Sequence, residues 1–209
     1  MDLKVYSSDR PFAALVLAHG AGAGQMSQFM VRAAQALAAR RITTATFDFP
    51  YVTAGRKVPD RAPVLEAAWQ DAIGSAHAQF RSLPLFIGGK SMGGRISSHI
   101  ASQGGAGPLA GLVFLGYPLH PPGKPGQRRD AHLPAIAEPM LFVQGSQDTF
   151  GTAEEIAALL PSLQRATLHE IAGGDHSFKV AGGKAKQEPA FQEVINAVAA
   201  WVETSAVHS

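Results

Sequence analysis

The feature that most restricts the fold of this chain is an apolar segment that runs directly into a glycine-rich turn, LFIGGKSMGG. Residues 85–88 read mostly as a buried strand, and the residues from Met92 onward read as a helix. The turn between them contains G-x-S-x-G, with Ser91 between Gly89 and Gly93. A strand, a sharp turn and a helix around such a serine form a nucleophile elbow, in which small flanking residues leave room for the strained serine backbone. We therefore interpret this turn as an elbow that presents Ser91.

The same letters also contain the end of a phosphate-binding P-loop, G-x-x-x-x-G-K-[ST], in which Lys90 would be a phosphate ligand. That motif requires a glycine at position 84, where this chain has Pro84. The residues between are mostly apolar, whereas a phosphate site needs a loop of free backbone N–H groups. An NTPase is therefore disfavoured. A glycine-rich turn with an ordinary surface serine stays open until the rest of the chain supplies partners for Ser91.

The composition is that of a globular chain. Of the 209 residues, 46% are hydrophobic and 16% are charged, which is enough apolar material for a sizeable core and argues against disorder. We expect a single domain over residues 1–209. The net charge of +2 is too small to predict nucleic-acid binding, and no apolar stretch approaches the roughly 18 residues of a membrane span. The absence of cysteine excludes disulfides, thiolate metal sites and a cysteine nucleophile.

An apolar run near the N-terminus, FAALVLA at residues 12–18, imitates the core of a signal peptide. The segment before it carries Asp2 and Asp9 as well as basic residues, and the run stops at His19. Both features disfavour secretion. We expect a cytoplasmic protein that is a monomer or a homodimer.

Strand-like and helix-like segments alternate along the chain. Continuous apolar or β-branched runs predict strands, and apolar residues at helical spacing predict helices between them. The strands are expected at residues 13–18, 42–47, 85–88, 112–115, 140–144 and 166–171, and the helices at 27–40, 63–81, 92–103, 152–160 and 188–203. Such alternation predicts an α/β fold with a mostly parallel sheet and helices on both of its faces.

Two polar residues follow successive predicted strands and could serve as partners for Ser91. Asp148 comes after the strand at 140–144, and His176 comes after the strand at 166–171. The carboxyl ends of parallel strands lie at the same edge of a sheet, which is where such folds collect their chemistry. Ser, Asp, His is also the chain order of hydrolases that carry an elbow. We expect His176 to be the general base and Asp148 to orient its imidazole.

A serine hydrolase also needs backbone donors for the oxyanion of its tetrahedral intermediate. One is expected to be the N–H of Met92, the residue after the nucleophile, and the other should come from a loop after an earlier strand. That loop is HGAGAG, which follows the strand at 13–18. We expect the N–H of Ala21 to serve, with Gly22 as the next candidate.

Four motifs together resemble the α/β-hydrolase superfamily: HGAGAG, GKSMGG, the GSQD turn and GGDHSF. Over nearly its whole length, the chain is similar to the compact, lidless branch that includes dienelactone-hydrolase-like proteins and small bacterial hydrolases. The resemblance implies the α/β-hydrolase fold, a mostly parallel twisted sheet of about seven strands with helices on both faces. It also implies a catalytic triad of Ser91, Asp148 and His176 that hydrolyses esters or related acyl compounds.

The chain departs from this branch in some respects. Dienelactone hydrolases themselves use cysteine, which this chain lacks, so their own activity is not expected. Lys90, directly before the nucleophile, has no role that we can assign. The region between the elbow helix and Asp148 is too short for a large cap domain. We expect a small-molecule acyl substrate, no nucleic acid partner, and neither a cofactor nor a metal ion.

The substrate contacts are expected on the loop after the strand at 112–115. There Tyr117, Leu119 and His120, with two prolines after them, would form a rigid and mostly apolar wall of the cleft. Basic residues also occur in the expected cleft loops: Arg56, Lys57, Arg61, Lys124, Arg128, Arg129 and Lys179. They read first as an ordinary solvated surface. The alternative is a basic rim that attracts an acyl substrate bearing a carboxylate or a phosphate.

Three further polar residues lie near the predicted site and have structural interpretations. His19 is expected to hold the glycine loop by a hydrogen bond, and Asp48 to bond local backbone in a turn. Asp175 is disfavoured as the acid of the triad because the side chains of adjacent residues rarely meet productively. The other histidines are scattered and lack metal-ligand spacing.

These patterns predict a serine hydrolase of carboxylic esters that works through an acyl-enzyme. A thioesterase or a peptidase would use the same machinery. A protein that keeps the fold but serves as a non-catalytic interaction module is the alternative from another class. The complete set of serine, acid and base argues against it, because a scaffold needs none of the three.

Overall fold

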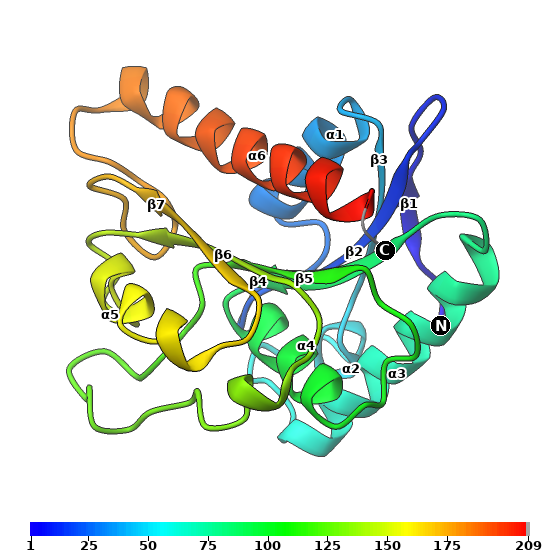
Figure 1. The fold of residues 1–209 in the computed structure, drawn as a ribbon, viewed down its shortest axis with the longest axis horizontal. Helices are drawn as coiled ribbons and strands as arrows, with labels where there is room; N and C mark the ends of the chain where they lie inside the picture. The colour runs from blue at the N-terminus through cyan, green and yellow to red at the C-terminus, as the bar shows by residue number, and fades with distance from the viewer. Residues whose placement is uncertain (208–209) are drawn as a thin grey trace.

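The computed structural model describes residues 1–207, except for the side chain of Lys184. A seven-stranded sheet in the order β1-β3-β2-β4-β5-β6-β7 forms its centre (Figure 1). The strands are β1 Lys4–Tyr6, β2 Ala13–Ala18, β3 Ile42–Phe47, β4 Leu85–Lys90, β5 Gly111–Leu115, β6 Met140–Gly145 and β7 Ala166–Ile171. All neighbouring strands pair in parallel except β1, which runs antiparallel to β3. The predicted mostly parallel sheet is confirmed.

Helices cover both faces of the sheet (Figure 1). They are α1 Gln28–Ala38, α2 Pro50–Thr53, α3 Ala62–Gln79, α4 Met92–Ser102, α5 Ala153–Ala157 and α6 Lys184–Ala206, with 3₁₀ turns η1 Leu133–Ala135 and η2 Leu160–Ser162. One hydrophobic cluster joins the sheet to α1 and α6, and another joins its opposite face to α3, α4 and α5. Among the described residues, no helix is both long and apolar enough to cross a membrane.

Strand β2 shows why an uninterrupted apolar run becomes a central strand here. All six of its residues are fully buried. Ala13, Leu15 and Leu17 pack toward α1 and α6, whereas the alternate residues Ala14, Val16 and Ala18 join the cluster on the other face. A strand that is covered on both faces needs apolar side chains at every position, which removes the usual polar alternation. Strands β3 to β6 also lie between other strands but include some polar residues, and the buried ones, Thr43, Thr44 and Thr46 in β3 and Gln144 in β6, form side-chain hydrogen bonds.

Several elements differ from the sequence prediction, among them the short helix α2 and the turn η1, which were not predicted. Strand β1 was not predicted, because it has three partly exposed residues and therefore no apolar run. The predicted helix at 152–160 begins with the expected capping box of Thr152 and Glu155, but its α-helical part ends at Ala157 and η2 follows. The closing helix begins at Lys184, before the predicted 188, and passes through Pro189. Proline usually sits in a first helical turn, so the sequence pattern placed the helix start too late.

Candidate active site

The elbow has the geometry that its sequence predicts. Strand β4 ends at Lys90, helix α4 begins at Met92, and Ser91 lies between them with φ of 50° and ψ of −115°. This is an unfavourable conformation for a residue with a side chain, and such strain persists only where surrounding structure fixes it. Here the N–H of Ser91 donates to Leu115 O at 3.0 Å, and its carbonyl accepts from Arg95 N at 3.0 Å. The backbone of neighbouring elements therefore holds Ser91 in place.

The glycines beside Ser91 are required by the close approach of strand β2. A Cβ atom added to Gly89 would lie 2.3 Å from Ala18 O, and one added to Gly93 would lie 2.4 Å from the same oxygen. Neither distance can accommodate a side chain. The two glycines thus let β2 and the elbow pack together at the carboxyl end of the sheet.

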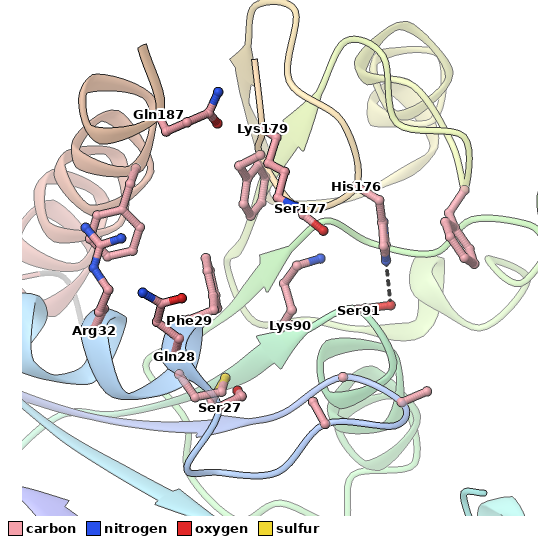
Figure 2. Close-up of a pocket in the computed structure, with 17 residues that line it drawn as sticks. Ser27, Gln28, Phe29, Arg32, Lys90, Ser91, His176, Ser177, Lys179 and Gln187 are labelled. Carbon is pink, nitrogen blue, oxygen red and sulfur yellow. Dashed lines mark hydrogen bonds between the residues drawn. The ribbon is translucent and has the colours of Figure 1, made fainter. Parts of the chain in front are cut away.

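The structure brings the three residues of the predicted triad into one hydrogen-bonded chain. His176 Nε2 lies 2.8 Å from Ser91 Oγ (Figure 2). On the other side of the ring, His176 Nδ1 lies 2.8 Å from Asp148 Oδ2. The side chain of Asp148 is fully buried, whereas that of His176 is 21% exposed. The imidazole can therefore be oriented from its buried side while its other nitrogen addresses the serine.

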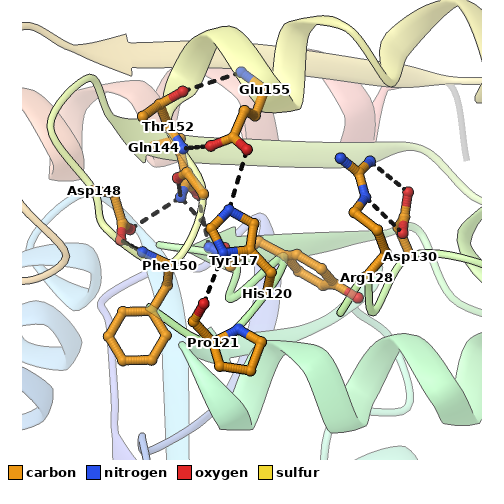
Figure 3. Close-up of polar contacts among 11 residues, drawn as sticks. Tyr117, His120, Pro121, Arg128, Asp130, Gln144, Asp148, Phe150, Thr152 and Glu155 are labelled. Atoms are coloured by element: carbon orange, nitrogen blue, oxygen red, sulfur yellow. Dashed lines mark hydrogen bonds and ion pairs between the residues drawn. The ribbon is translucent and has the colours of Figure 1, made fainter. Parts of the chain in front are cut away.

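Asp148 receives further donors that fix its carboxylate. Phe150 N donates to Oδ1 at 2.8 Å, and Gln144 Nε2 donates to Oδ2 at 3.0 Å (Figure 3). Asp175 has a different environment, because its Oδ1 accepts from the backbone N–H groups of Ser177 and Lys179. It shapes the loop that carries His176 and does not contact the imidazole.

Gln144 is a functional residue that sequence reasoning missed. Its side chain is fully buried at the end of β6. Nε2 also donates to Gly151 O at 2.6 Å and to Tyr117 O at 3.3 Å, while Oε1 accepts from Tyr117 N at 2.7 Å. A single amide thus connects the loop after β5 to the loop that carries Asp148. The sequence feature that could have identified Gln144 is a glutamine near the end of an otherwise apolar strand.

The two nitrogens of His176 are engaged, and one face of its ring is covered. The ring of Phe150 stacks on it at 4.2 Å between centroids with an interplanar angle of 30°. Such stacked ring pairs are favourable, so the contact helps to hold the imidazole in this orientation. Phe150 belongs to the same loop as Asp148, so one short segment supplies both contacts.

The glycine-rich loop after β2 lies against the nucleophile. A Cβ placed on Gly20 would be 3.5 Å from Ser91 Cβ, and Ala21 lines the same cavity as Ser91. Ala23 N donates to Gly20 O at 3.2 Å, and Gly22 has φ of 71°, so the loop is a tight turn that needs glycine at this position. The expected donor Ala21 therefore sits on the cavity wall, whereas Gly22 does not line the cavity.

His19 holds the glycine loop as expected, whereas Asp48 binds a residue of another loop and not the local backbone of its own turn. His19 is completely buried, its Nδ1 lies 2.9 Å from Gly20 O, and Phe49 N donates to its Nε2 at 3.3 Å. Burial lowers the pKa of His19, which favours the neutral ring that these two bonds require. Asp48 accepts from the backbone and side-chain nitrogens of Gln25. Both residues hold the loop after β2 and leave the chemistry to others.

A cavity of about 800 Å³ opens beside Ser91 and His176. Helix α1, the beginning of α6 and the loop after β7 form its walls (Figure 2). Its apolar lining is mainly Phe29, Met30, Phe150, Phe178 and Phe191. Its charged lining consists of Arg32, Lys90 and Lys179, and no Asp or Glu of the described chain lines it.

The expected substrate contacts at Tyr117, Leu119 and His120 do not agree with the structure. All three are buried, and none lines the cavity. Tyr117 Oη donates to Arg129 O at 2.9 Å. His120 Nε2 lies 3.1 Å from Glu155 Oε1 (Figure 3). Their loop turns inward because its aromatic and apolar side chains fill the core under β5 and β6.

The cavity wall comes instead from α1 and α6. Phe29 and Phe191 pack against the core under their helices and also line the cavity, because a helix that overhangs a cavity uses the same face for both purposes. Of the basic residues named for a rim, only Lys179 lines the cavity. Arg56 and Arg128 are paired with Asp60 and Asp130 at 2.7 Å each.

Lys90 is the unusual charged residue of the site. Its Nζ is inaccessible to solvent and has no hydrogen-bond partner among the described residues. Nζ lies 5.3 Å from the centre of the Phe178 ring. Burial lowers the pKa of Lys90 to about 8, against an opposing effect of Asp148 and Asp175.

No group of three or more His, Cys, Asp or Glu residues in the described part of the chain could hold a metal ion. The side chains around Ser91 are those of acid–base and nucleophilic chemistry. A hydroxyl, an imidazole bonded to it and a buried carboxylate can together activate the hydroxyl as a nucleophile.

Solved structures with this fold include several hydrolases. An alpha-beta serine hydrolase homologue from Coxiella burnetii is 16% identical, with a TM-score of 0.74 over 93% of this chain and 89% of that one. Dienelactone hydrolase from Anabaena variabilis is 18% identical, with a TM-score of 0.74 over 97% and 90%. A serine hydrolase without lid from Xanthomonas campestris is 19% identical, with a TM-score of 0.69 over 96% and 88%. At these identities, the likeness shows the α/β-hydrolase fold.

The chain has the compact form of this fold. The segment between α4 and β6 holds β5, η1 and an inward-turned loop, and no large cap is present in the described residues. The family model described as alpha/beta hydrolase domain matches residues 11–203, which covers all of the sheet except β1. The chain therefore belongs to the alpha/beta hydrolase family.

Proposed function

We propose that this protein is a serine hydrolase that cleaves carboxylic esters through an acyl-enzyme. The observation that carries the proposal is the unbroken chain from Asp148 through His176 to Ser91, with both hydrogen bonds at 2.8 Å. A serine hydroxyl is barely nucleophilic by itself, and an adjacent oriented base is what activates it. Hydrolase neighbours with the same fold, such as an esterase domain from Rhodothermus marinus, agree with this class of reaction.

In the first half of the reaction, Ser91 Oγ attacks the ester carbonyl carbon while His176 Nε2 takes the hydroxyl proton. The tetrahedral intermediate collapses, the bond to the alkoxy oxygen breaks, and the imidazolium returns that proton to the departing alcohol. Asp148 stabilises the imidazolium and holds the tautomer in which Nε2 can accept. The product that stays behind is the acyl ester of Ser91.

In the second half, water replaces the alcohol. His176 deprotonates the water, which attacks the acyl carbon, and Ser91 leaves with the proton from the imidazolium. Both intermediates place negative charge on the former carbonyl oxygen. We assign the N–H groups of Met92 and Ala21 as its donors, with Gly22 as an alternative to Ala21. Their support is that Met92 opens helix α4 beside Ser91, where the helix dipole favours negative charge, and that Ala21 lines the cavity.

A thioesterase or a peptidase would share this machinery, and a non-catalytic interaction module would share the fold. The cavity favours a small acyl substrate over a protein partner, because it is a concave and mainly apolar site that opens at the nucleophile. The strained backbone of Ser91 favours catalysis over scaffolding for a similar reason, since a binding module has no use for that strain.

Labelling with a fluorophosphonate probe and mapping the modified residue by mass spectrometry tests the proposal without knowledge of the substrate. We expect modification of Ser91 that is lost in Ser91→Ala and strongly slowed in His176→Ala. Ser177→Ala is the matched control, because this serine lines the same cavity and should leave the labelling of Ser91 unchanged. A folded wild-type protein that reacts at no serine, or at Ser177 instead, would overturn the proposal.

A further inference from the structure

Lys90 is a buried cation that the proposed reaction does not use. His176 already occupies the position of the base at Ser91 Oγ, so the amine is not needed for proton transfer. Nζ has no hydrogen-bond partner among the described residues, although a buried ammonium is normally paired. The space that it fills is left by Gly116, where an added Cβ would come within 2.8 Å of Nζ. The structure therefore has space for the ammonium group of Lys90 but gives it no hydrogen-bond partner.

The carboxylates nearest to Lys90 are committed elsewhere. Asp148 and Asp175 both interact with it electrostatically. Asp148 is bonded to His176, and Asp175 accepts from the backbone of Ser177 and Lys179. Neither forms an ion pair with Lys90, so the local negative charge does not satisfy the ammonium.

The charged side chains that line the cavity next to Lys90 are all basic. This cavity is lined by cations and aromatic rings, and no carboxylate of the described residues reaches it. Arg32 is already balanced by Glu188 at 2.5 Å and lies over the ring of Phe191 at 4.1 Å. Lys179 is exposed at the mouth. The unbalanced positive charge thus lies at Lys90, beside the nucleophile, and at Lys179, at the entrance.

We propose that the cavity receives the acyl part of an ester whose acid carries a second, free carboxylate, and that the ammonium of Lys90 binds this carboxylate. The inference rests on the proposed function, because it concerns the substrate of that same site. The aliphatic stem of Lys90 lines the cavity, and turning its outer bonds carries Nζ from the pocket beside Gly116 to an occupant. Such an anion supplies the partner that the free protein lacks.

The position of Lys90 also restricts where the second carboxylate lies. Lys90 directly precedes Ser91, so the anion must be a short distance from the scissile carbonyl. Half-esters of short dicarboxylic acids fit this requirement, whereas a carboxylate at the end of a long chain would pass Lys90 and reach Arg32 or the mouth. Lys179, which is exposed, contributes by attracting the anion from solution, and its effect should fall with ionic strength.

The test compares esters of the same shape that differ in charge. Ethyl hydrogen succinate is matched by ethyl 4-methylpentanoate, in which an isopropyl group replaces the carboxylate, and ethyl hydrogen glutarate is matched by ethyl 5-methylhexanoate. Release of ethanol gives kcat/KM for each. In the wild type, we expect the charged member of the succinate pair to be favoured by about tenfold or more, as a hydrogen-bonded charge pair allows.

Variants assign this preference to a residue. Lys90→Met keeps the length of the side chain without its charge, and we expect it to abolish the preference ratio. Lys179→Met should lower the ratio modestly and only at low salt, whereas Lys124→Met, an exposed lysine away from the cavity, should keep it. A wild type that favours the neutral esters, or a ratio that survives in Lys90→Met, would overturn the inference.

Fluorophosphonate labelling of the same preparations distinguishes a failure of the inference about Lys90 from a failure of the proposed function. If Ser91 does not react and no ester is cleaved, the proposed function fails and the inference falls with it. If Ser91 reacts but the charged esters gain nothing over their neutral partners, only the role of Lys90 is wrong. Loss of the preference in Lys90→Met, with Ser91 still reactive in the wild type, supports both.

Discussion

Replacing Lys90 by methionine is expected to stabilise the folded protein at neutral pH. The ammonium has no hydrogen-bond partner in the described structure, and methionine fills a similar volume without a charge. The pKa of Lys90 falls from 10.5 in the unfolded chain to about 8 in the folded protein. At about 1.36 kcal/mol per unit of pKa, this difference corresponds to a destabilisation of roughly 3 kcal/mol at neutral pH.

The sign of the pH dependence follows from proton binding. Between pH 8 and 10.5, the unfolded chain holds the Lys90 proton and the folded protein releases it. Stability must therefore rise with pH across this window, because the unfolded state binds more protons. Below the window the full cost of the buried charge is present, and above it the cost is absent. Lys90→Met should lack this rise and should exceed the wild type by roughly 3 kcal/mol at pH 7 and by little near pH 10.5.

Equilibrium unfolding in urea, followed by tryptophan fluorescence at pH 7 and pH 10, measures this difference directly. Lys179→Met is the matched control, because it removes an exposed cation from the same cavity and should change stability by less than about 0.5 kcal/mol. A Lys90→Met protein that is less stable than the wild type at pH 7 would refute the reasoning. So would a gain that is equally large at pH 7 and pH 10.

Three further substitutions test the framework around the triad. Gln144→Leu should lower the free energy of unfolding by about 2–3 kcal/mol in urea, because it leaves the N–H of Tyr117 and the carbonyl of Gly151 without partners. It should also reduce kcat, because Asp148 loses one of the donors that fix its carboxylate; unchanged kcat would contradict the role given to Gln144. Gly93→Ala should yield little folded protein in a thermal melt, since its Cβ would meet Ala18 O at 2.4 Å; a normal melting temperature would show that the elbow can open. Asp148→Asn should keep the fold and reduce kcat by about 10³–10⁴-fold in an ester assay, through loss of the correct imidazole tautomer, whereas a loss below tenfold would remove Asp148 from the proposed mechanism.

The parts of the site that the sequence predicted follow from short motifs and from the topology of a parallel sheet. Ser91 was identifiable because a strained turn between strand and helix requires glycine on both sides. Asp148 and His176 could be located because each follows a buried strand, and parallel strands bring such positions to one edge. Topology alone made these three residues neighbours. Each inference used a short stretch of sequence and a general rule about sheets.

The parts that were missed depend on how distant segments pack. The loop with Tyr117 and His120 follows a strand next to the elbow, so its position suggested a cleft wall. Its side chains turn into the core, and nothing in the local sequence distinguishes an inward from an outward loop. Phe29 and Phe191 contact both the core and the cavity. Helical periodicity predicts which face of a helix is apolar, but it does not predict whether that face packs on the core or lines a cavity.

Strand geometry gives the last reason to treat Lys90 as functional. In β4, Phe86 packs on the face of the sheet that carries α1 and α6, and alternation places Lys90 on this same face. That position is next to the buried Phe178 and would ordinarily hold an apolar side chain. A lysine kept there for structure alone should have a hydrogen-bond or ion-pair partner, and beyond the ring of Phe178 the described residues provide none. Proteins lose stability at sites where function needs an unfavourable group. The same Lys90→Met variant therefore measures both sides of this exchange: the gain in folding free energy and the loss of preference for a carboxylate-bearing ester.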